Sequence, residues 1–424
     1  MKFPAFLFIL AVTAFAESKT FTLRQALDLA LTQNPDVLIA RLDQQKSRTQ
    51  VSLMRDPFLP KLSAGTGAAY TSGYPTSIDG NPPAIIQGKL GMALFNRPQS
   101  YLVAQAREGV RTAAMETTRR QSEIVYRVTS LYLDTEQAVQ SVTALQRELE
   151  NLSKVRELTE QRVAEGRELA IESKKASLAV LRARQRAETL RLDLAGAENL
   201  LAQVLGLPPG DTVKVAPEQR EPLPVPLSEE ISIETALEAS NDLKILQSNV
   251  QARLLEIKSY QSARLPKIDF ITQYAMLAKR NYQDYFSRFQ RNNEEIGLAI
   301  EIPLIVGRAN SAQQMQAEIE VAKLRVEVGR TRTRIAGELR KGYQDLRRAE
   351  AARELARADL DLSREELEID LAQMDEGRLP LAKVEAARAS ENEKWLAYYE
   401  AQHAAEIAKL NVMRQMGTLE AALR

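Results

Sequence analysis

Few residues in this sequence could perform catalysis or hold a metal ion. The chain has no cysteine, and His403 is its only histidine. Thiol chemistry, disulfides and zinc sites built from cysteine or histidine clusters are therefore excluded. A single histidine near the end of a helical stretch is more often a packing or surface residue than a general acid or base. No nucleophile–base set, phosphate loop or metal cluster is found, so we predict neither an enzyme nor a cofactor.

Acidic and basic residues nearly cancel in this chain. It has 57 lysines and arginines against 56 aspartates and glutamates, which gives a formal net charge of +1. This balance is not that of a nucleic-acid-binding protein. A charged fraction of 27% with only 5% aromatic residues is typical of long helices that expose polar faces to water. We therefore predict a mainly α-helical chain with a small β part.

Residues 1–16 are expected to be a signal peptide. Lys2 precedes an apolar run that ends at Phe15, and Ala14-Phe15-Ala16 has the small-x-small form of a cleavage site. This run is too short to cross a bilayer, and no later stretch approaches about twenty apolar residues. No cysteine follows that could carry a lipid anchor. We expect an exported chain whose membrane attachment comes from β-strands.

The remaining sequence is an internal duplication. Landmarks recur in the same order about 210 residues apart, which is the signature of a structural repeat. The clearest matches are Leu59-Pro60-Lys61-Leu62 with Leu265-Pro266-Lys267-Ile268, and Glu165-Gly166-Arg167 with Glu376-Gly377-Arg378. We predict two repeats, 17–207 and 231–424, joined by a proline-rich linker, 208–230, that cannot be helical.

Each repeat is expected to contain a helix, two strands, a very long helix, a tip turn and a returning helix. Proline is absent from Gln99 to Leu207, so helix can continue for about sixty to seventy residues, or roughly 100 Å. Two heptad rows on one predicted helix lie about 140° apart, and they are Leu355, Leu362, Ile369 and Leu360, Leu367, Met374. Such a helix has a neighbour on each side, as in a closed ring of helices or in a bundle core.

Four segments alternate apolar residues with polar or small ones and are predicted to be strands. Each covers about nine to eleven residues, the length that a tilted strand needs to cross the hydrocarbon layer. Members of the apolar face are Leu62, Tyr70, Leu90, Phe270, Tyr274, Leu298 and Ile300. A pair of soluble hairpins on a core is the alternative, but two matched hairpins in an exported chain favour membrane strands.

Four strands cannot close into a barrel, and an open edge in lipid leaves backbone groups unsatisfied. A dimer would supply eight strands, whose interior side chains fill, whereas a trimer would supply twelve and leave a water-filled pore. We therefore predict a homotrimer. The segment from Lys279 to Phe289 interleaves basic and aromatic residues, which suits contact with outer-membrane lipid better than binding of nucleic acid.

This layout resembles the TolC-like outer-membrane efflux proteins, the outer membrane factors, over essentially the whole mature chain. The shared landmarks are Ala26-Leu27, Asn34-Pro35-Asp36, Leu205-Gly206-Leu207-Pro208 and Ile302-Pro303-Leu304. The resemblance implies a trimeric twelve-stranded outer-membrane β-barrel above a periplasmic α-helical barrel. It also implies a passive exit duct that docks on a periplasmic adaptor (membrane fusion) protein and an inner-membrane pump of RND or ABC type. Such ducts serve tripartite efflux pumps or type I secretion systems.

The resemblance further implies that the two tip turns form the entrance gate or the adaptor contact. The residues concerned are Gly166, Arg167, Glu172, Asp375, Glu376, Gly377, Arg378 and Lys383. Lys383 stands where well-known members have an aspartate, so an acidic ring is not predicted. Our hypothesis is that Arg167 and Arg378 hold the entrance shut or contact the adaptor. A charged constriction and merely solvated turn residues stay open as alternatives.

Two other readings of the sequence remain. The heptads alone would support an exported coiled-coil scaffold without a pore. A periplasmic adaptor is also rich in helical hairpins, although adaptors usually have one hairpin inserted into β-rich domains. The sequence names no transported substrate, because a duct takes its selectivity largely from its pump.

Overall fold

The computed structural model describes residues 18–66, 84–216, 218, 223–226, 228–277, 290–376 and 378–423. Within these ranges the chain is mainly helical with a small sheet part, as the sequence predicts. Several predictions concern residues outside the described ones, namely those on the signal peptide 1–16, Tyr70, the segment 279–289 and Gly377.

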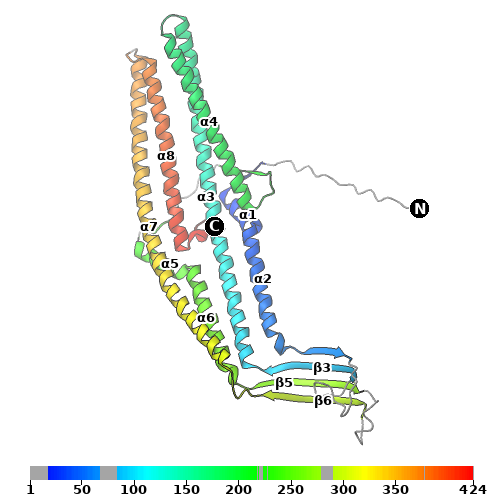
Figure 1. Ribbon diagram of the computed structural model, residues 1–424. Coiled ribbons are helices and arrows are strands. Elements are labelled where there is room, and N and C mark those ends of the chain that lie inside the picture. The colour runs from blue at the N-terminus through cyan, green and yellow to red at the C-terminus, as the bar shows by residue number, and fades with distance from the viewer. Residues whose placement is uncertain are drawn as a thin grey trace, which may run out of the picture. The chain divides into compact units, whose positions relative to one another are not determined.

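The same succession of elements occurs twice along the chain (Figure 1). The first succession is α1 Leu23–Gln33, α2 Pro35–Arg55, β2 Lys61–Gly65, β3 Ala84–Phe95, α3 Arg97–Ala164 and α4 Ala170–Leu205. The second is α5 Glu229–Ala239, α6 Asn241–Gln261, β5 Lys267–Leu277, β6 Asn292–Glu301, α7 Arg308–Asp375 and α8 Leu381–Met416. Corresponding helices have equal lengths of 11, 21, 68 and 36 residues. Short 3-10 turns at Asp56–Phe58 and Ser262–Arg264 lead into β2 and β5, and α9 Leu419–Leu423 ends the described chain.

None of the helices within the described ranges combines the length and the apolar character that a membrane span requires.

The chain divides into two compact units that do not follow the order of the sequence. Unit 1 comprises Met1–Ile39, Thr118–Ser240 and Arg332–Arg424, and unit 2 comprises Ala40–Thr117 and Asn241–Thr331, each over its described residues. Each unit therefore takes part of both successions of elements, because the long helices α3 and α7 continue from unit 2 into unit 1.

Unit 2 contains one antiparallel sheet with the strand order β2-β3-β5-β6 (Figure 1). The register aligns the apolar positions across the sheet. Leu62 pairs with Leu90, which pairs with Thr272, and Thr272 pairs with Ile296. Because paired residues project to the same side of a sheet, the predicted apolar alternation becomes one mainly apolar face, with Thr272 and Glu294 among its polar members.

The helices of unit 2 contact one another in the same order as the strands. Gln99 on α3 donates to the Met54 carbonyl on α2, and Ser259 on α6 donates to the Pro98 carbonyl on α3. Apolar residues of α6 and α7 then pack together around Ile257 and Val321. The order α2, α3, α6, α7 thus mirrors β2, β3, β5, β6, as expected when each strand continues into its own helix.

Unit 1 has the largest apolar core. Residues from α1, α3, α4 and α8 meet there, with Val128, Leu205, Leu410 and Met413 almost fully buried. In Figure 1 α4 runs beside α3, and α8 runs beside α7. A smaller apolar cluster lies further along α3, where Leu145 packs with Ala187 of α4 and Leu396 of α8.

A small parallel sheet in unit 1 was not predicted from the sequence. β1 Ser18–Phe21 pairs with β4 Thr212–Val215, which lies within the segment 208–230 predicted as a linker. The Tyr132 hydroxyl donates to the Phe21 and Ala216 carbonyls at 3.2 and 3.1 Å, next to this sheet. The predicted linker is therefore partly ordered by strand pairing. The prediction that none of it is helical is wrong at its end, because Glu229 and Glu230 already belong to α5.

The two predicted heptad rows on α7 lie in different environments. Leu360 is 3% exposed, and Leu367 and Met374 are half-buried, so this row is covered within the chain. Leu355, Leu362 and Ile369 remain 56–66% exposed. One flank of α7 thus has a neighbour in the same chain, whereas the apolar row on the other flank is exposed in the single chain.

Candidate functional site

The first tip turn joins α3 to α4 and depends on one left-handed residue. Gly166 has a φ of +72°, a conformation that glycine adopts without steric penalty. The Arg167 N–H donates to the Arg162 carbonyl at 2.8 Å, and the Gly166 N–H donates to the Val163 carbonyl at 3.0 Å. These bonds satisfy carbonyls at the end of α3, so the helix stops sharply and the chain reverses.

The second tip turn, between α7 and α8, repeats this geometry where it is described. The Arg378 N–H donates to the Gln373 carbonyl at 2.9 Å, which matches the bond from Arg167 in the first tip. Pro380 occupies the N-cap position of α8, and the Lys383 N–H donates to its carbonyl at 3.0 Å. Gly377 itself lies outside the described residues.

Both tips carry the same exposed ion pair. Arg167 contacts Glu165 at 3.1 Å, and Arg378 contacts Glu376 at 3.0 Å. Each arginine side chain is 76% exposed. An ion pair this exposed contributes about 0–1 kcal/mol to stability, because water screens it and two long side chains lose entropy. These ion pairs therefore contribute little to the stability of the turns. Each arginine can leave its glutamate and contact another acidic group.

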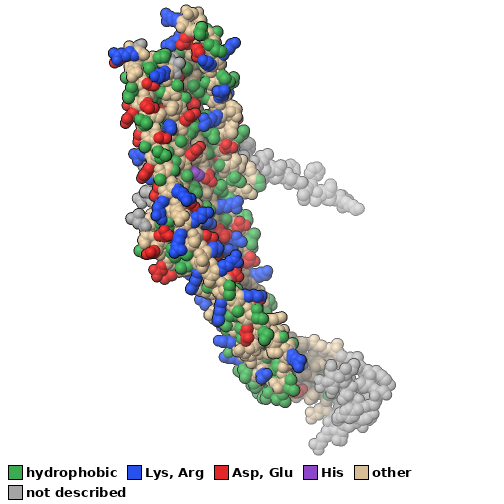
Figure 2. All heavy atoms as spheres, turned by 60° about the vertical axis from the view of Figure 1, so that its left-hand side comes forward, with side chains coloured by type: hydrophobic (Ala, Val, Ile, Leu, Met, Phe, Trp, Pro, Cys, Tyr) green, Lys and Arg blue, Asp and Glu red, His purple; other side chains and the backbone are tan. Residues whose placement is uncertain are grey.

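The remaining predicted tip residues surround the turns with charge of both signs. Glu172 lies in the first turn of α4 and contacts Lys175 at 2.8 Å. Asp375 is the last residue of α7 and is exposed, and Lys383 is exposed in the first turn of α8. On the face drawn in Figure 2, basic and acidic side chains likewise alternate along the helices.

Glu385 is a carboxylate near the second tip with an altered pKa. It lies on α8, its side chain is only 12% exposed, and it contacts Arg388 at 3.6 Å. Burial raises the pKa of Glu385 above its usual range, and the attraction of Arg388 offsets only part of that rise. The charged form of this residue is therefore disfavoured in the folded protein.

The predicted strand residues lie on the apolar face of the unit 2 sheet. Those placed in described strands are Leu62, Leu90, Phe270, Tyr274, Leu298 and Ile300. Leu62, Leu298 and Ile300 are 60–77% exposed. An exposed apolar face of this kind marks a surface that contacts lipid or another protein.

His403 has a contact that sequence analysis did not find. Its Nε2 lies 2.7 Å from Oδ1 of Asp134, so the pair joins α8 to α3 within unit 1. A cavity of about 190 Å³ opens beside it, lined partly by Glu136, Glu218 and Glu406. Across the described part of the chain, no group of three or more His, Asp and Glu side chains could hold a metal ion.

A match to a known family decides what these features belong to. The sequence model described as outer membrane efflux protein matches residues 26–207 and 232–418, which is most of the chain. This chain belongs to the outer membrane efflux protein family. The first matched range covers the first succession of elements described above, and the second matched range covers the second.

Solved structures show the same fold at low sequence identity. A membrane protein from Pseudomonas aeruginosa aligns with a TM-score of 0.76 and 18% identity, covering 93% of each chain. The CmeC outer membrane channel of Campylobacter jejuni aligns at 0.75 and 13%, covering 94% of this chain and 86% of that one. VceC of Vibrio cholerae aligns at 0.74 and 15%, covering 93% and 96%. Comparison with curated protein sequences gives no significant match.

Family membership establishes the general role and place of the protein. This outer membrane efflux protein is a transport channel and not an enzyme. It resides in the cell outer membrane and extends into the periplasm, as the sequence predicts.

Proposed function

We propose that the protein is one protomer of a homotrimeric exit duct, which conducts substrates passively across the periplasm and the outer membrane. The observation that carries this proposal is the four-stranded sheet of unit 2. One face of the sheet is mainly apolar, and its residues Leu62, Leu298 and Ile300 are exposed in the single chain. Lipid contact would bury that face, with the polar face turned toward a water-filled interior.

The edges of the sheet support the trimer. Among the described strands, β2 pairs only with β3, and β6 pairs only with β5. In a bilayer, each unpaired backbone N–H or C=O would cost several kcal/mol. Three copies would pool twelve strands into a closed barrel that is wide enough for a pore. The exposed heptad row of α7 adds a second surface that a neighbouring copy would cover.

We further propose that the duct works with a periplasmic adaptor protein and an inner-membrane pump, in a tripartite efflux pump or a type I secretion system. The tip turns would provide the docking or gate surface. Their ion pairs are exposed and weak, so Arg167 and Arg378 are free to contact an acidic partner surface. The inner-membrane pump would supply the energy.

The main alternative is an exported helical scaffold or an adaptor without a pore. Such a protein needs no sheet with an exposed, mainly apolar face. Family membership and the sheet both favour the channel.

Conductance measurements would test the proposal. Detergent-purified protein is inserted into a planar bilayer, and its mass is measured in the same detergent. Discrete channels from a particle three times the 47.4 kDa chain mass, less any cleaved signal peptide, are expected. A species that is soluble without detergent and shows no conductance would leave the scaffold as the better description.

A further inference from the structure

We propose that unit 2 carries a binding surface for anionic phospholipid headgroups, at the end of its sheet where strands and helices join. We call the four junctions between a helix and a strand the collar, and they are residues 55–59, 94–97, 264–265 and 302–308. This inference rests on the proposed membrane strands and goes further by naming the class of lipid and the residues that bind it.

All four junctions lie at one end of the sheet. β2 and β5 begin at the collar, and β3 and β6 end there, because neighbouring strands are antiparallel. The register agrees, since Phe95 pairs with Ile268 and Lys267 pairs with Glu301 at this end. The helices α2, α3, α6 and α7 all join the sheet here (Figure 1). Because the chain extends into the periplasm, a sheet in the outer membrane would place the collar at the periplasmic leaflet.

Each junction carries one exposed arginine. They are Arg55, Arg97, Arg264 and Arg308. Arg97 and Arg308 hold equivalent places, since each is the first residue of a 68-residue helix. Among the described residues, none of the four arginines forms an ion pair with a carboxylate. The collar therefore presents positive charge that the described part of the chain does not neutralise.

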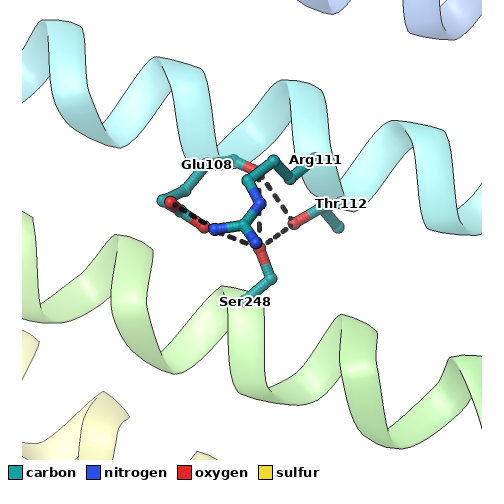
Figure 3. Close-up of polar contacts among 4 residues, drawn as sticks. All are labelled: Glu108, Arg111, Thr112 and Ser248. Carbon is teal, nitrogen blue, oxygen red and sulfur yellow. Dashed lines mark hydrogen bonds and ion pairs between the residues drawn. The ribbon is translucent and has the colours of Figure 1, made fainter.

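The stability of the long helices does not explain these arginines. Further along α3, Arg111 is paired in the usual way, because it contacts Glu108 at 3.2 Å (Figure 3). A positive charge at the first residue of a helix is repelled by the partial positive charge of that end. Neither α3 nor α7 has an acidic residue in its first turn to offset the repulsion from Arg97 or Arg308. An anion outside the chain would supply the partner.

Arg97 has an aromatic neighbour that suits the boundary of a membrane. Its guanidinium carbon lies 4.8 Å from the ring centre of Tyr101, and its Nη2 donates to the Tyr101 hydroxyl at 3.2 Å. Tyrosine is enriched at membrane–water interfaces, where its ring lies among the headgroups. The planar guanidinium has further N–H groups, and its geometry matches the oxygens of a phosphate. Arg97 is therefore positioned to donate to a lipid phosphate.

Exposed apolar residues lie beside these arginines. Leu304 and Ile305, close to Arg308, are 90% and 91% exposed. The others are Leu59, Leu94, Phe95, Leu265 and Ile302. Ile302 follows Ile300 by two residues, so the apolar row of β6 continues toward the collar. The exposed apolar surface of the sheet thus reaches the level of the arginines.

This combination fits the boundary between acyl chains and headgroups. The apolar side chains would enter the acyl region, and the guanidinium groups would stay at the phosphates. An anionic headgroup carries a net negative charge that a zwitterionic headgroup lacks. The collar should therefore concentrate anionic phospholipids such as phosphatidylglycerol around itself.

A second copy of the chain is the other occupant to consider. The collar contains four arginines and one carboxylate, Asp56, which already contacts Lys61. Two collars side by side would therefore repel each other. Lipid phosphates between them would relieve that repulsion, so charge complementarity favours lipid.

Quenching of a single tryptophan by brominated lipids would test the collar. Trp395, the only tryptophan of the chain, is replaced by phenylalanine, and Leu304→Trp places the probe close to Arg308. The protein is reconstituted in phosphatidylcholine vesicles with a minor share of phosphatidylglycerol, and either one lipid or the other has brominated acyl chains. The matched probe is Val326→Trp, an exposed position about 27 Å along α7 from Arg308.

We expect bromine on either lipid to quench the tryptophan at position 304, and neither to quench it at position 326. Phosphatidylglycerol should be enriched around position 304 by about fivefold for each arginine that contacts it. Arg308→Gln should remove most of this enrichment, and high salt should reduce it by screening. Arg325→Gln removes the same charge from α7 outside the collar and should leave the enrichment unchanged.

The equivalent test on α3 uses Phe95→Trp as the probe, Arg97→Gln as the collar variant and Arg111→Gln as the control. Equal enrichment with and without Arg97 and Arg308 would overturn the binding of anionic headgroups. A tryptophan at position 304 that neither lipid quenches, in a protein that still forms channels, would overturn the collar and leave the duct intact. A protein that does not enter the vesicles would overturn the membrane strands and the collar together.

Discussion

At the scale of single residues, the two tips present the same arginine in the same setting. We predict that Arg378→Glu changes single-channel conductance or adaptor affinity, because it replaces an attraction to Glu376 by a repulsion on an exposed surface. Stability should change by no more than about 0.5 kcal/mol, since the side chain is exposed and its pair is weak. The measurements are planar-bilayer conductance, adaptor binding and thermal unfolding. Arg167→Glu should act in the same direction.

A matched control separates the tip from a general effect of charge. Arg348→Glu makes the same charge change on α7 at an equally exposed arginine, which contacts Asp345 at 3.5 Å. It should leave adaptor affinity unchanged. If charge reversal at both tip arginines leaves conductance and adaptor affinity as they were, these residues are only solvated turn residues.

Glu385 should make stability depend on pH in a predictable direction. Its pKa is higher in the folded protein than in the unfolded chain because the carboxyl group is buried. The folded state therefore binds the proton more tightly, so stability rises as pH falls from neutral through the raised pKa. Glu385→Gln should be more stable than the native protein near neutral pH and have a flatter pH profile. Thermal unfolding between pH 5 and 8 checks this, and identical profiles would contradict it.

Long-range pairs of single residues could not be predicted from the sequence. The contact of His403 with Asp134 joins positions far apart in the chain, and neither residue belongs to a motif. The same is true of Ser248 and Glu108. By contrast, the apolar strand residues could be predicted, because alternation along a strand directly determines which face each side chain takes.

At the scale of elements, the junction between α1 and the end of α4 requires glycine. Gly206 has a φ of +80°, and a Cβ there would lie 2.7 Å from the Gln33 carbonyl oxygen. Gly206→Ala should therefore destabilise the protein by about 1–3 kcal/mol, through backbone strain and this close contact. Gly210→Ala is the control, because Gly210 also has a positive φ but no neighbouring atom within 4 Å. The free energy of unfolding of both variants is measured with a denaturant. If Gly206→Ala and Gly210→Ala lower it equally, the contact with Gln33 does not contribute.

The long helices and the hairpins were predictable because they depend on local signals. A proline-free stretch permits a helix of 68 residues, and glycine between charged residues marks the turn at Gly166. The pairing of β1 with β4 was not predictable. Both strands have only four residues, and the partners come from opposite ends of the first half of the chain. Such short segments lack the alternation that identifies a strand.

At the scale of the whole molecule, the two heptad rows of α7 would separate folding of the chain from assembly of the proposed trimer. Leu360 is 3% exposed and Leu362 is 57% exposed, although they are two residues apart on one helix. Leu360→Ala should remove side-chain packing within the chain and lower the free energy of unfolding by about 2–5 kcal/mol. A charge at Leu362 should leave the single chain folded, because the side chain lies in water there.

Leu362→Lys should therefore weaken assembly without unfolding the protomer. Burying a leucine contributes about 1.5–3 kcal/mol, and a closed trimer loses that contribution at each of its three interfaces. Mass measured in detergent over a dilution series should show dissociation of the variant at concentrations where the proposed trimer of the native protein persists. Its circular dichroism should stay helical, whereas Leu360→Ala should lower the unfolding temperature. A variant that remains as trimeric as the native protein would show that the exposed row faces water or an adaptor instead of a neighbouring copy.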